Sequence, residues 1–261
     1  EEPLAPQELA RTNLEKLRQT APQWYPLAAY LSGKGFDLYR NTALRYLPTG
    51  EAYLEDMLTT LDTAQRFIFL EYFIMAEGEI WDRLSDILCR KSRQGVEVKL
   101  IFDDFGSMMR MPNEKIDALQ DAGVEVRVFN PVHHYVNRLY FNYRDHRKIT
   151  CVDGDIAYTG GANIADEYAN LIERFGYWKD CGLRLEGEGA WGLTREFLQM
   201  WQRMDGQLYH EYDYYRPLHH PLEQGFCQTV VDGPDDNPNN AAEDLFLQMI
   251  GRARREVYIT T

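Results

Sequence analysis

One short segment combines polar residue types at spacings that suit chemistry on a phosphate group. It reads His146-x-Lys148, four residues, Asp153, six residues, and then Gly160-Gly161-x-Asn163. A neutral imidazole can attack phosphorus or protonate a leaving group, and a cation beside an amide donor can stabilise charged phosphate oxygens. His146, Lys148 and Asp153 are therefore the candidate catalytic residues, and Asn163 and Gly161 are candidate substrate-binding residues.

The local pattern indicates how these side chains are positioned. Residues 147–152 alternate as a strand, so His146 and Lys148 should point from the same face. Asp153-Gly154 is typical of a hairpin turn, and the apolar strand 156–159 follows it. The glycine pair then allows a close backbone approach to a ligand before Asn163. We expect His146, Lys148 and Asn163 to converge on one concave site. The alternative is a His that caps a strand beside a solvated Lys, and the complete spacing argues against it.

Glu71 is a further substrate-binding candidate. It ends the apolar strand predicted for residues 66–74, as a residue in an active-site wall would. A purely structural acid at this position is an equally good interpretation.

Around this segment, strand and helix patterns alternate along the chain. Helical spacing covers residues 51–64, 80–88 and 113–122, and strand patterns cover residues 66–74, 96–102 and 124–128. Repeated strand–helix–strand units favour parallel pairing with crossover helices. The predicted fold class is α/β, with a mixed, largely parallel β-sheet flanked by helices on both faces.

Three regions are predicted. Residues 1–35 form a helical lead-in, with a helix at 7–19 and a linker marked by Pro22, Pro26, Gly33 and Gly35. Residues 36–215 form the domain that carries the motif. Residues 216–261 form a connector and the start of a second domain, because residues 55–71 resemble residues 244–260 at a constant offset. Any α/β protein shows some similarity between its helix–strand units, so chance resemblance remains the alternative.

Composition limits the class of protein. The 261 residues include 41 acidic and 28 basic side chains, which give a formal net charge of −13. This balance argues against general nucleic-acid binding, which needs clustered Lys and Arg. The four cysteines are scattered singly, so neither a zinc site nor a disulfide framework is predicted, and a reducing compartment fits best. No run of about 18 apolar residues is present, so no membrane span is expected within this chain.

The motif matches that of the phospholipase D superfamily, with Gly161 where many members carry Ser. The likeness to bacterial cardiolipin synthases extends over about residues 36–205. It includes Gly-Ala-Asn-Ile-Ala-Asp-Glu-Tyr at 161–168, Asp-Asp-Phe-Gly-Ser at 103–107, and Trp178-x-Asp180. A departure is Glu188-Gly189-Ala190-Trp191, where this subfamily has Gly-Pro-Ala-Val; it concerns packing more than chemistry.

This resemblance implies a mechanism that uses two such motifs. One His forms a phosphohistidine and the other protonates the leaving alcohol, while Lys and Asn of each motif hold the phosphate oxygens. These roles fall on His146, Lys148 and Asn163, with either His role open for His146, and Asp153 positions the site. The resemblance implies no metal ion and no other cofactor.

The implied function is a phosphatidyl transferase that acts on phosphatidylglycerol at the cytoplasmic face of a bacterial membrane. Its partners would be a phospholipid, the membrane surface and a second His-Lys-Asp half in cis or in trans, without nucleic acid. A rival interpretation is a nuclease or phosphodiesterase of the same superfamily that works as a single-motif homodimer. A third is an inactive interaction module, which the completeness of the motif disfavours.

Overall fold

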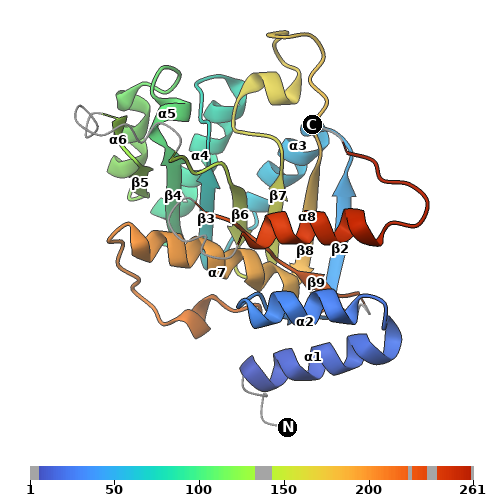
Figure 1. Cartoon of the computed structure of the whole chain (residues 1–261). Helices are drawn as coiled ribbons and strands as arrows, with labels where there is room; N and C mark the ends of the chain where they lie inside the picture. Colours follow the sequence, from blue (N-terminus) through green and yellow to red (C-terminus); the bar gives the residue numbers. More distant parts are fainter. Residues whose placement is uncertain (1–5, 133–142, 223–224, 234–239, 260–261) are drawn as a thin grey trace.

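A single sheet runs through the middle of the main domain in the computed structural model, which describes residues 6–132, 143–222, 225–233 and 240–259 (Figure 1). Seven strands form this sheet within the described residues. Their order across it is β2 (Thr42–Leu47), β8 (Gly182–Gly187), β7 (Ile156–Gly160), β6 (Lys148–Val152), β3 (Phe67–Tyr72), β4 (Glu97–Asp103) and β5 (Glu125–Phe129).

The directions of these strands correct one part of the prediction. The α/β class, the mixed sheet and the helices on both faces are confirmed, but "largely parallel" is wrong. In the described sheet only the β3–β4 and β4–β5 pairings are parallel, and the other four are antiparallel. The strand–helix–strand pattern ends with β5. Beyond it the Asp153-Gly154 turn joins β6 to β7 as a hairpin, which can only be antiparallel.

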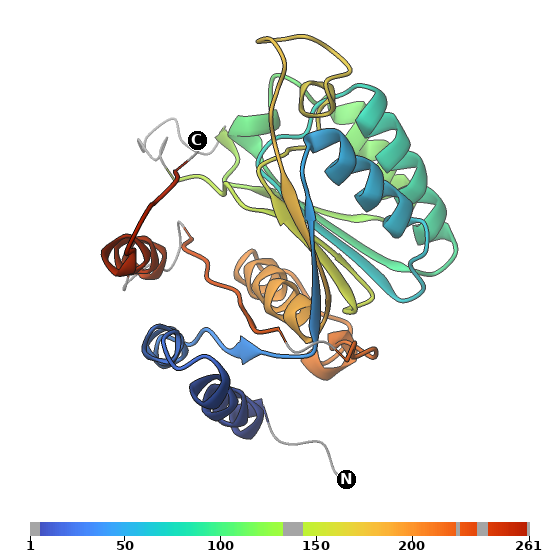
Figure 2. The same ribbon diagram turned by 90° about the vertical axis from the view of Figure 1, so that its right-hand side faces the viewer.

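Helices cover the two faces of the sheet (Figure 2). On one face lie α3 (Gly50–Leu61), α4 (Glu79–Arg93) and α6 (Asn113–Asp121), and on the other lies α7 (Glu188–Arg203). Side chains along β3 alternate between the two cores, so Leu70 and Tyr72 pack towards α3 and α4, while Phe67 and Phe69 pack towards α7. Both faces of β3 are therefore buried, as its unbroken apolar pattern predicts.

The N-terminal region contains a helix that the sequence pattern did not indicate. The predicted helix is α1 (Pro6–Thr20), but the expected linker contains α2 (Tyr25–Gly33). Pro26 lies in the first turn of α2, where a missing N–H costs nothing, and Leu27, Ala28 and Leu31 are buried. Proline here starts a helix and does not mark a linker.

The C-terminal region returns to this N-terminal part. Strand β9 (Cys227–Gln228) pairs with β1 (Leu38–Tyr39), and Gln228 Nε2 donates to the carbonyl oxygen of Phe36 at 2.7 Å. Helix α8 (Ala241–Arg252) lies beside α2, where Tyr30 bonds to Asp244. Three short elements complete the described structure: α5 (Asp104–Ser107), η2 (Asp166–Ala169) and η3 (Tyr212–Tyr215). In the ranges described above, no helix is both long enough and apolar enough to cross a bilayer.

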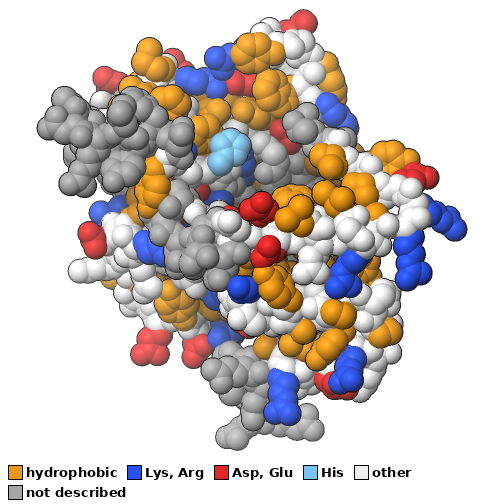
Figure 3. Space-filling view, in the orientation of Figure 1, with side chains coloured by type: hydrophobic (Ala, Val, Ile, Leu, Met, Phe, Trp, Pro, Cys, Tyr) orange, Lys and Arg blue, Asp and Glu red, His pale blue; other side chains and the backbone are white. Residues whose placement is uncertain are grey.

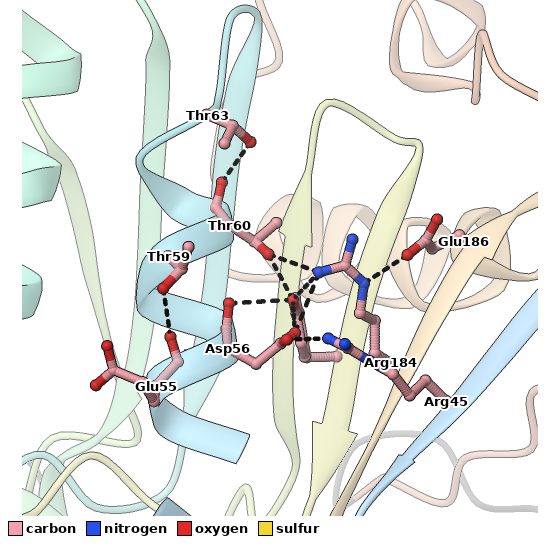
Figure 4. Close-up of polar contacts among 9 residues, drawn as sticks. Arg45, Glu55, Asp56, Thr59, Thr60, Thr63, Arg184 and Glu186 are labelled. Atoms are coloured by element: carbon pink, nitrogen blue, oxygen red, sulfur yellow. Dashed lines mark hydrogen bonds and ion pairs between the residues drawn. The ribbon is translucent and has the colours of Figure 1, made fainter. Parts of the chain in front are cut away.

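A polar cluster fastens α3 to the antiparallel side of the sheet (Figure 4). Asp56 of α3 contacts Arg45 of β2 and lies 3.1 Å from Arg184 Nη1 of β8. Tyr158 of β7 joins the cluster, since its hydroxyl lies 2.5 Å from Asp56 Oδ1 and 2.7 Å from the Thr60 hydroxyl. The polar residues of β2 and β8 therefore have a structural role at this edge.

Candidate active site

The strand directions bring the motif to the carboxyl ends of the parallel strands. Lys148 is the first residue of β6 and pairs with Tyr72, the last residue of β3. The strand predicted at 147–152 is thus confirmed with a start one residue later. His146 and Lys148 lie on one face, as expected, because Lys148 Nζ is 3.0 Å from His146 Nδ1 and 2.5 Å from its carbonyl oxygen.

Burial and neighbouring charges tune both side chains. Partial burial, with help from the Lys148 charge, lowers the pKa of His146 below its usual value, while Asp145 opposes this. His146 is therefore neutral at neutral pH and keeps a lone pair for chemistry. Burial lowers the pKa of Lys148 to about 8, against the pull of Asp145 and Asp180. Lys148 is still mostly charged at pH 7, as a group that holds phosphate oxygens must be.

The protons on the His146 ring bear on its role in the reaction. When charged Lys148 donates to Nδ1, the neutral ring carries its proton on Nε2. Attack by Nε2 on phosphorus needs the other neutral tautomer, with the proton on Nδ1 and the lone pair on Nε2. The acid role needs the imidazolium, with a proton on both nitrogens, because only that form becomes neutral when it gives a proton to a leaving oxygen. The two roles of a motif His therefore differ in the number of protons on the ring.

Asn163 lies next to this pair but is anchored within the protein. Its Oδ1 accepts from the backbone N–H of Ile74 at 3.0 Å, and its Nδ2 donates to the Tyr168 hydroxyl at 2.8 Å. The adjacent Phe73 ring is 4.7 Å from the His146 ring and 5.6 Å from Lys148 Nζ. An amide nitrogen carries two protons, so the Tyr168 bond uses one of them. Asn163 thus fixes the Phe73–Ile74 wall of the site.

Gly161 is needed for a different reason from the one expected. A Cβ atom at this position would come within 2.3 Å of Asp180 Oδ1. The close approach is therefore made by a carboxylate of the protein, which also accepts from the backbone N–H of Cys181 at 2.8 Å. The charge of Asp180 acts on Lys148. In the sequence only the resemblance at Trp178-x-Asp180 marks Asp180, and the structure places its charge among the surroundings of the site.

Asp153 lies far from the other motif residues, which corrects its place among the catalytic candidates. It follows the last residue of β6, whereas Lys148 is the first, so about 16 Å of strand separates them. Its carboxylate accepts from the backbone N–H groups of Gln65, Arg66 and Phe67 at 2.7–2.9 Å. Asp153 therefore fastens the start of β3 to the β6–β7 turn.

We predict that Asp153→Ala lowers the free energy of unfolding by about 2–3 kcal/mol, the scale of lost hydrogen bonds to a charged group. Asp153 also has a φ of 55°, which Ala tolerates poorly. Urea unfolding of the 261-residue chain measures the change. Asp153→Asn, which keeps one acceptor and suits this φ, should lose less. Equal stability of Asp153→Ala and the unmodified chain would contradict this assignment.

Glu71 faces away from the motif. Tyr72 pairs with Lys148, and successive strand residues point to opposite faces, so Glu71 lies on the α7 side with Ile149. It is fully buried, and its Oε1 lies 2.7 Å from Arg147 Nε. Glu71 therefore lies on the opposite face of β3 from His146 and Lys148 and contacts Arg147, which does not fit the predicted place in the active-site wall. Among the side chains described, no group of three or more His, Cys, Asp or Glu is arranged to hold a metal ion.

Comparisons with known proteins identify the family of this chain. Residues 57–174 match the family described as "Cardiolipin synthase, PLD-like domain". The chain is 39% identical over 251 residues to an uncharacterized protein of Streptococcus mutans, covering 95% of this chain and 54% of that protein. It is 36% identical over 248 residues to a cardiolipin synthase of Geobacillus kaustophilus, covering 92% and 48%. The chain thus spans about half the length of these relatives.

A solved structure shows the same fold. The phosphatidylserine synthase of Haemophilus influenzae superimposes with a TM-score of 0.50 at 16% identity, over 69% of this chain and 43% of that one. At this identity the likeness concerns the fold alone. Together, the motif geometry, the matched domain and the relatives place this chain in the phospholipase D superfamily, with a domain of the cardiolipin synthase type.

Proposed function

We propose that this chain supplies one half of the active site of a phosphatidyl transferase that makes cardiolipin from phosphatidylglycerol. The observation that carries the proposal is the His146 ring, which lies 3.0 Å from the Nζ of the buried Lys148. The cardiolipin synthase relatives support the choice of reaction. Because phosphatidylglycerol is a bilayer lipid, the site would work at a membrane surface, and we propose the cytoplasmic face of a bacterial membrane.

The proposed reaction has two steps. One motif His bonds to phosphorus, and the other gives a proton in the first step and takes one back in the second. A ring nitrogen of one His forms a bond to phosphorus, the P–O bond to glycerol breaks, and the glycerol oxygen takes a proton from the other His. The hydroxyl of a second phosphatidylglycerol then returns a proton to that His and attacks phosphorus, and the N–P bond breaks. Lys148 would neutralise the phosphate oxygens throughout. His146 fits either role.

We base this second half on the similarity between residues 55–71 and 244–260. The helix of this unit is present in both places, but residues 253–259 form no strand in the structure. The C-terminal residues Phe246, Leu247, Ile250, Val257 and Ile259 are 46–73% exposed. At the constant offset, their counterparts in the first unit are Met57, Leu58, Leu61, Ile68 and Leu70, all at most 2% exposed. Hydrophobic side chains also gather on this part of the surface in Figure 3. Side chains that are core in one copy and exposed in the other indicate a second domain that packs over α8.

The direct test is transfer of a labelled phosphatidyl group between phosphatidylglycerol molecules by the complete two-motif protein in detergent–lipid micelles. Labelled cardiolipin and free glycerol should form in equal amounts. Release of labelled phosphatidic acid alone would indicate hydrolysis in place of transfer. Cleavage of DNA or RNA without lipid transfer would contradict the proposal and favour the nuclease interpretation.

We predict that Lys148→Ala in the complete enzyme lowers kcat/KM. The loss should correspond to about 2–4 kcal/mol of transition-state stabilisation, the scale of one preorganised hydrogen-bond donor. The loss should be largest below pH 8 and should shrink above it, because the pKa of Lys148 is lowered to about 8 and the ammonium is then lost in the unmodified enzyme. Rates of transfer from pH 6 to 9 measure both effects.

Lys91→Met is the matched control for this prediction. Lys91 is also buried, but its Nζ donates to the carbonyl oxygen of Ala64 away from the motif. This variant should change stability and leave kcat/KM near the unmodified value. An equal loss of kcat/KM in both variants would remove the special role of Lys148.

A further inference from the structure

Two buried carboxyl groups share one guanidinium directly behind the motif His. Asp145 and Arg147 flank His146 in sequence, and Glu71 reaches them from β3. Glu71 and Asp145 are 0% and 1% exposed, and the Arg147 side chain is 13% exposed. The mechanism proposed above uses none of these three side chains.

The contacts within this acid pair leave polar atoms without partners. Arg147 Nε lies 2.7 Å from Glu71 Oε1 and 3.2 Å from Asp145 Oδ1. In the described structure neither Glu71 oxygen receives a well-directed hydrogen bond, and Asp145 Oδ2 receives none. Burying carboxylate oxygens without hydrogen-bond donors costs free energy. A proton on one of the two carboxyl groups would provide the missing donor.

The charges lead to the same conclusion. Two carboxylates and one guanidinium would leave a net negative charge out of water, and Glu196 of α7, 6% exposed, adds another acid nearby. Burial raises the pKa of Glu71 well above its usual value; Arg147 opposes this, while Asp145 and Glu196 add to it. One shared proton removes the excess charge and supplies the missing hydrogen bond, as in other close carboxyl pairs.

We propose that Glu71 is a positioning residue that, in its protonated form, donates to Asp145 while Arg147 lies against its other oxygen. Asp145 and Arg147, the residues on either side of His146, are then both held by Glu71 on the opposite face of the sheet. The imidazole therefore keeps its direction towards phosphorus. The inference rests on the proposed function for its catalytic consequence, but the protonation of Glu71 can be tested without it.

The surroundings of Glu71 define what a pH experiment reports. Arg147 and Asp145 face it from the segment before β6, Cys151 lies near it on β6, and Glu196 faces it from α7. Asp103 at the end of β4 and Arg144 form the next layer, since Asp103 accepts from the backbone N–H of Asp145 at 3.1 Å and lies 3.3 Å from Arg144 Nη1. Among these groups Glu71 is the one proposed to be protonated, and a Gln amide can imitate it because it offers an N–H donor beside an acceptor oxygen.

The first experiment compares Glu71→Gln with Glu167→Gln by thermal unfolding of the 261-residue chain from pH 5 to 9. Glu167 is 4% exposed; burial works to raise its pKa, but Arg110 and Arg174 outweigh this and lower it. A raised pKa means that stability is lost as pH rises above the ordinary value of about 4.5. Glu71→Gln should therefore match the unmodified Tm at pH 5 and exceed it increasingly towards pH 9. Glu167→Gln should be less stable than the unmodified chain by a nearly constant amount across this range, because a carboxyl with a lowered pKa loses its contribution only below about pH 4.5.

The second experiment measures transfer by the complete enzyme. Glu71→Gln should keep kcat within a few-fold. Glu71→Leu, which cannot bond to Asp145, should lower kcat about 100-fold at unchanged KM, the scale of a small misplacement of a reacting group. Infrared spectra should show the carbonyl stretch of a protonated acid in the unmodified chain and its loss in Glu71→Gln.

The outcomes separate the two proposals. If Glu71→Gln is destabilised at neutral pH as Glu167→Gln is, Glu71 is ionised and the inference is overturned. If Glu71→Leu folds and keeps its kcat, the positioning role is overturned. If Glu71→Leu does not fold, the Gln variant and the infrared band still decide the protonation. If the complete unmodified enzyme transfers no lipid, the proposed function fails. The thermal unfolding experiments still test whether Glu71 is protonated.

Discussion

His146→Asn should abolish lipid transfer by the complete enzyme while leaving the fold unchanged. In either motif role His146 makes or breaks a bond to a proton or to phosphorus, and an amide can do neither at this position. Asn approximates the Nδ1 side of the ring, so the bond with Lys148 Nζ, which is 3.0 Å long in the structure, has a substitute. Initial rates of cardiolipin formation measure the loss, and thermal unfolding checks the fold.

The same variant separates the two roles of His146. If His146 is the nucleophile, no phosphohistidine forms in the variant. If His146 is the acid, a substrate with a good leaving group, such as a nitrophenyl phosphodiester, should still produce a labelled phosphohistidine that is then trapped. His219→Asn is the control, since His219 is exposed and pairs with Asp155 at the opposite end of the sheet. Wild-type transfer by purified His146→Asn would refute the assignment.

The parts of the fold that were predictable are those with strong local periodicity. The buried strands β3 and β4 have nearly unbroken apolar patterns, and the helices α3 and α4 have helical spacing, so their bounds agree with the sequence to within a few residues. Strands β2 and β8 were missed because they carry polar side chains, such as Arg45 and Arg184, that serve the cluster with Asp56. Strand direction was misjudged because periodicity shows that a strand exists and not which neighbour it pairs with.

The residues of the site also differ in how far the sequence predicts their positions. His146 and Lys148 are two residues apart on a strand, and the period of two fixes their common face. Asp153 is five residues beyond Lys148, and only the extended geometry of β6 reveals that it ends up remote from it. Asp180, one of two acids whose charge acts on Lys148, comes from the segment just before β8, and no local pattern links the two. Glu71 shows the limit most clearly, since one residue of register decides which face of β3 it occupies.

The 261-residue chain alone should transfer lipid at no more than a trace of the rate of the complete enzyme. The proposed reaction needs one motif His as the nucleophile and a second as the acid, and this sequence has one His-x-Lys-x4-Asp motif. Without the second His, either the nucleophile or the acid is missing, and each contributes orders of magnitude to the rate. Labelled phosphatidyl transfer by the purified chain, with the complete protein as the reference, measures this directly.

A symmetric dimer is the arrangement that would defeat this prediction, because two chains could bring two copies of His146 together. The exposed apolar side chains of α8 and of residues 257–259 disfavour it, since their counterparts in residues 55–71 are core residues and the proposed second half would cover them. The net charge of −13 also opposes self-association. Light scattering should therefore give the mass of a monomer, and adding the second half as a separate chain should restore transfer. Robust activity from a homodimer would instead establish the single-motif architecture for this protein.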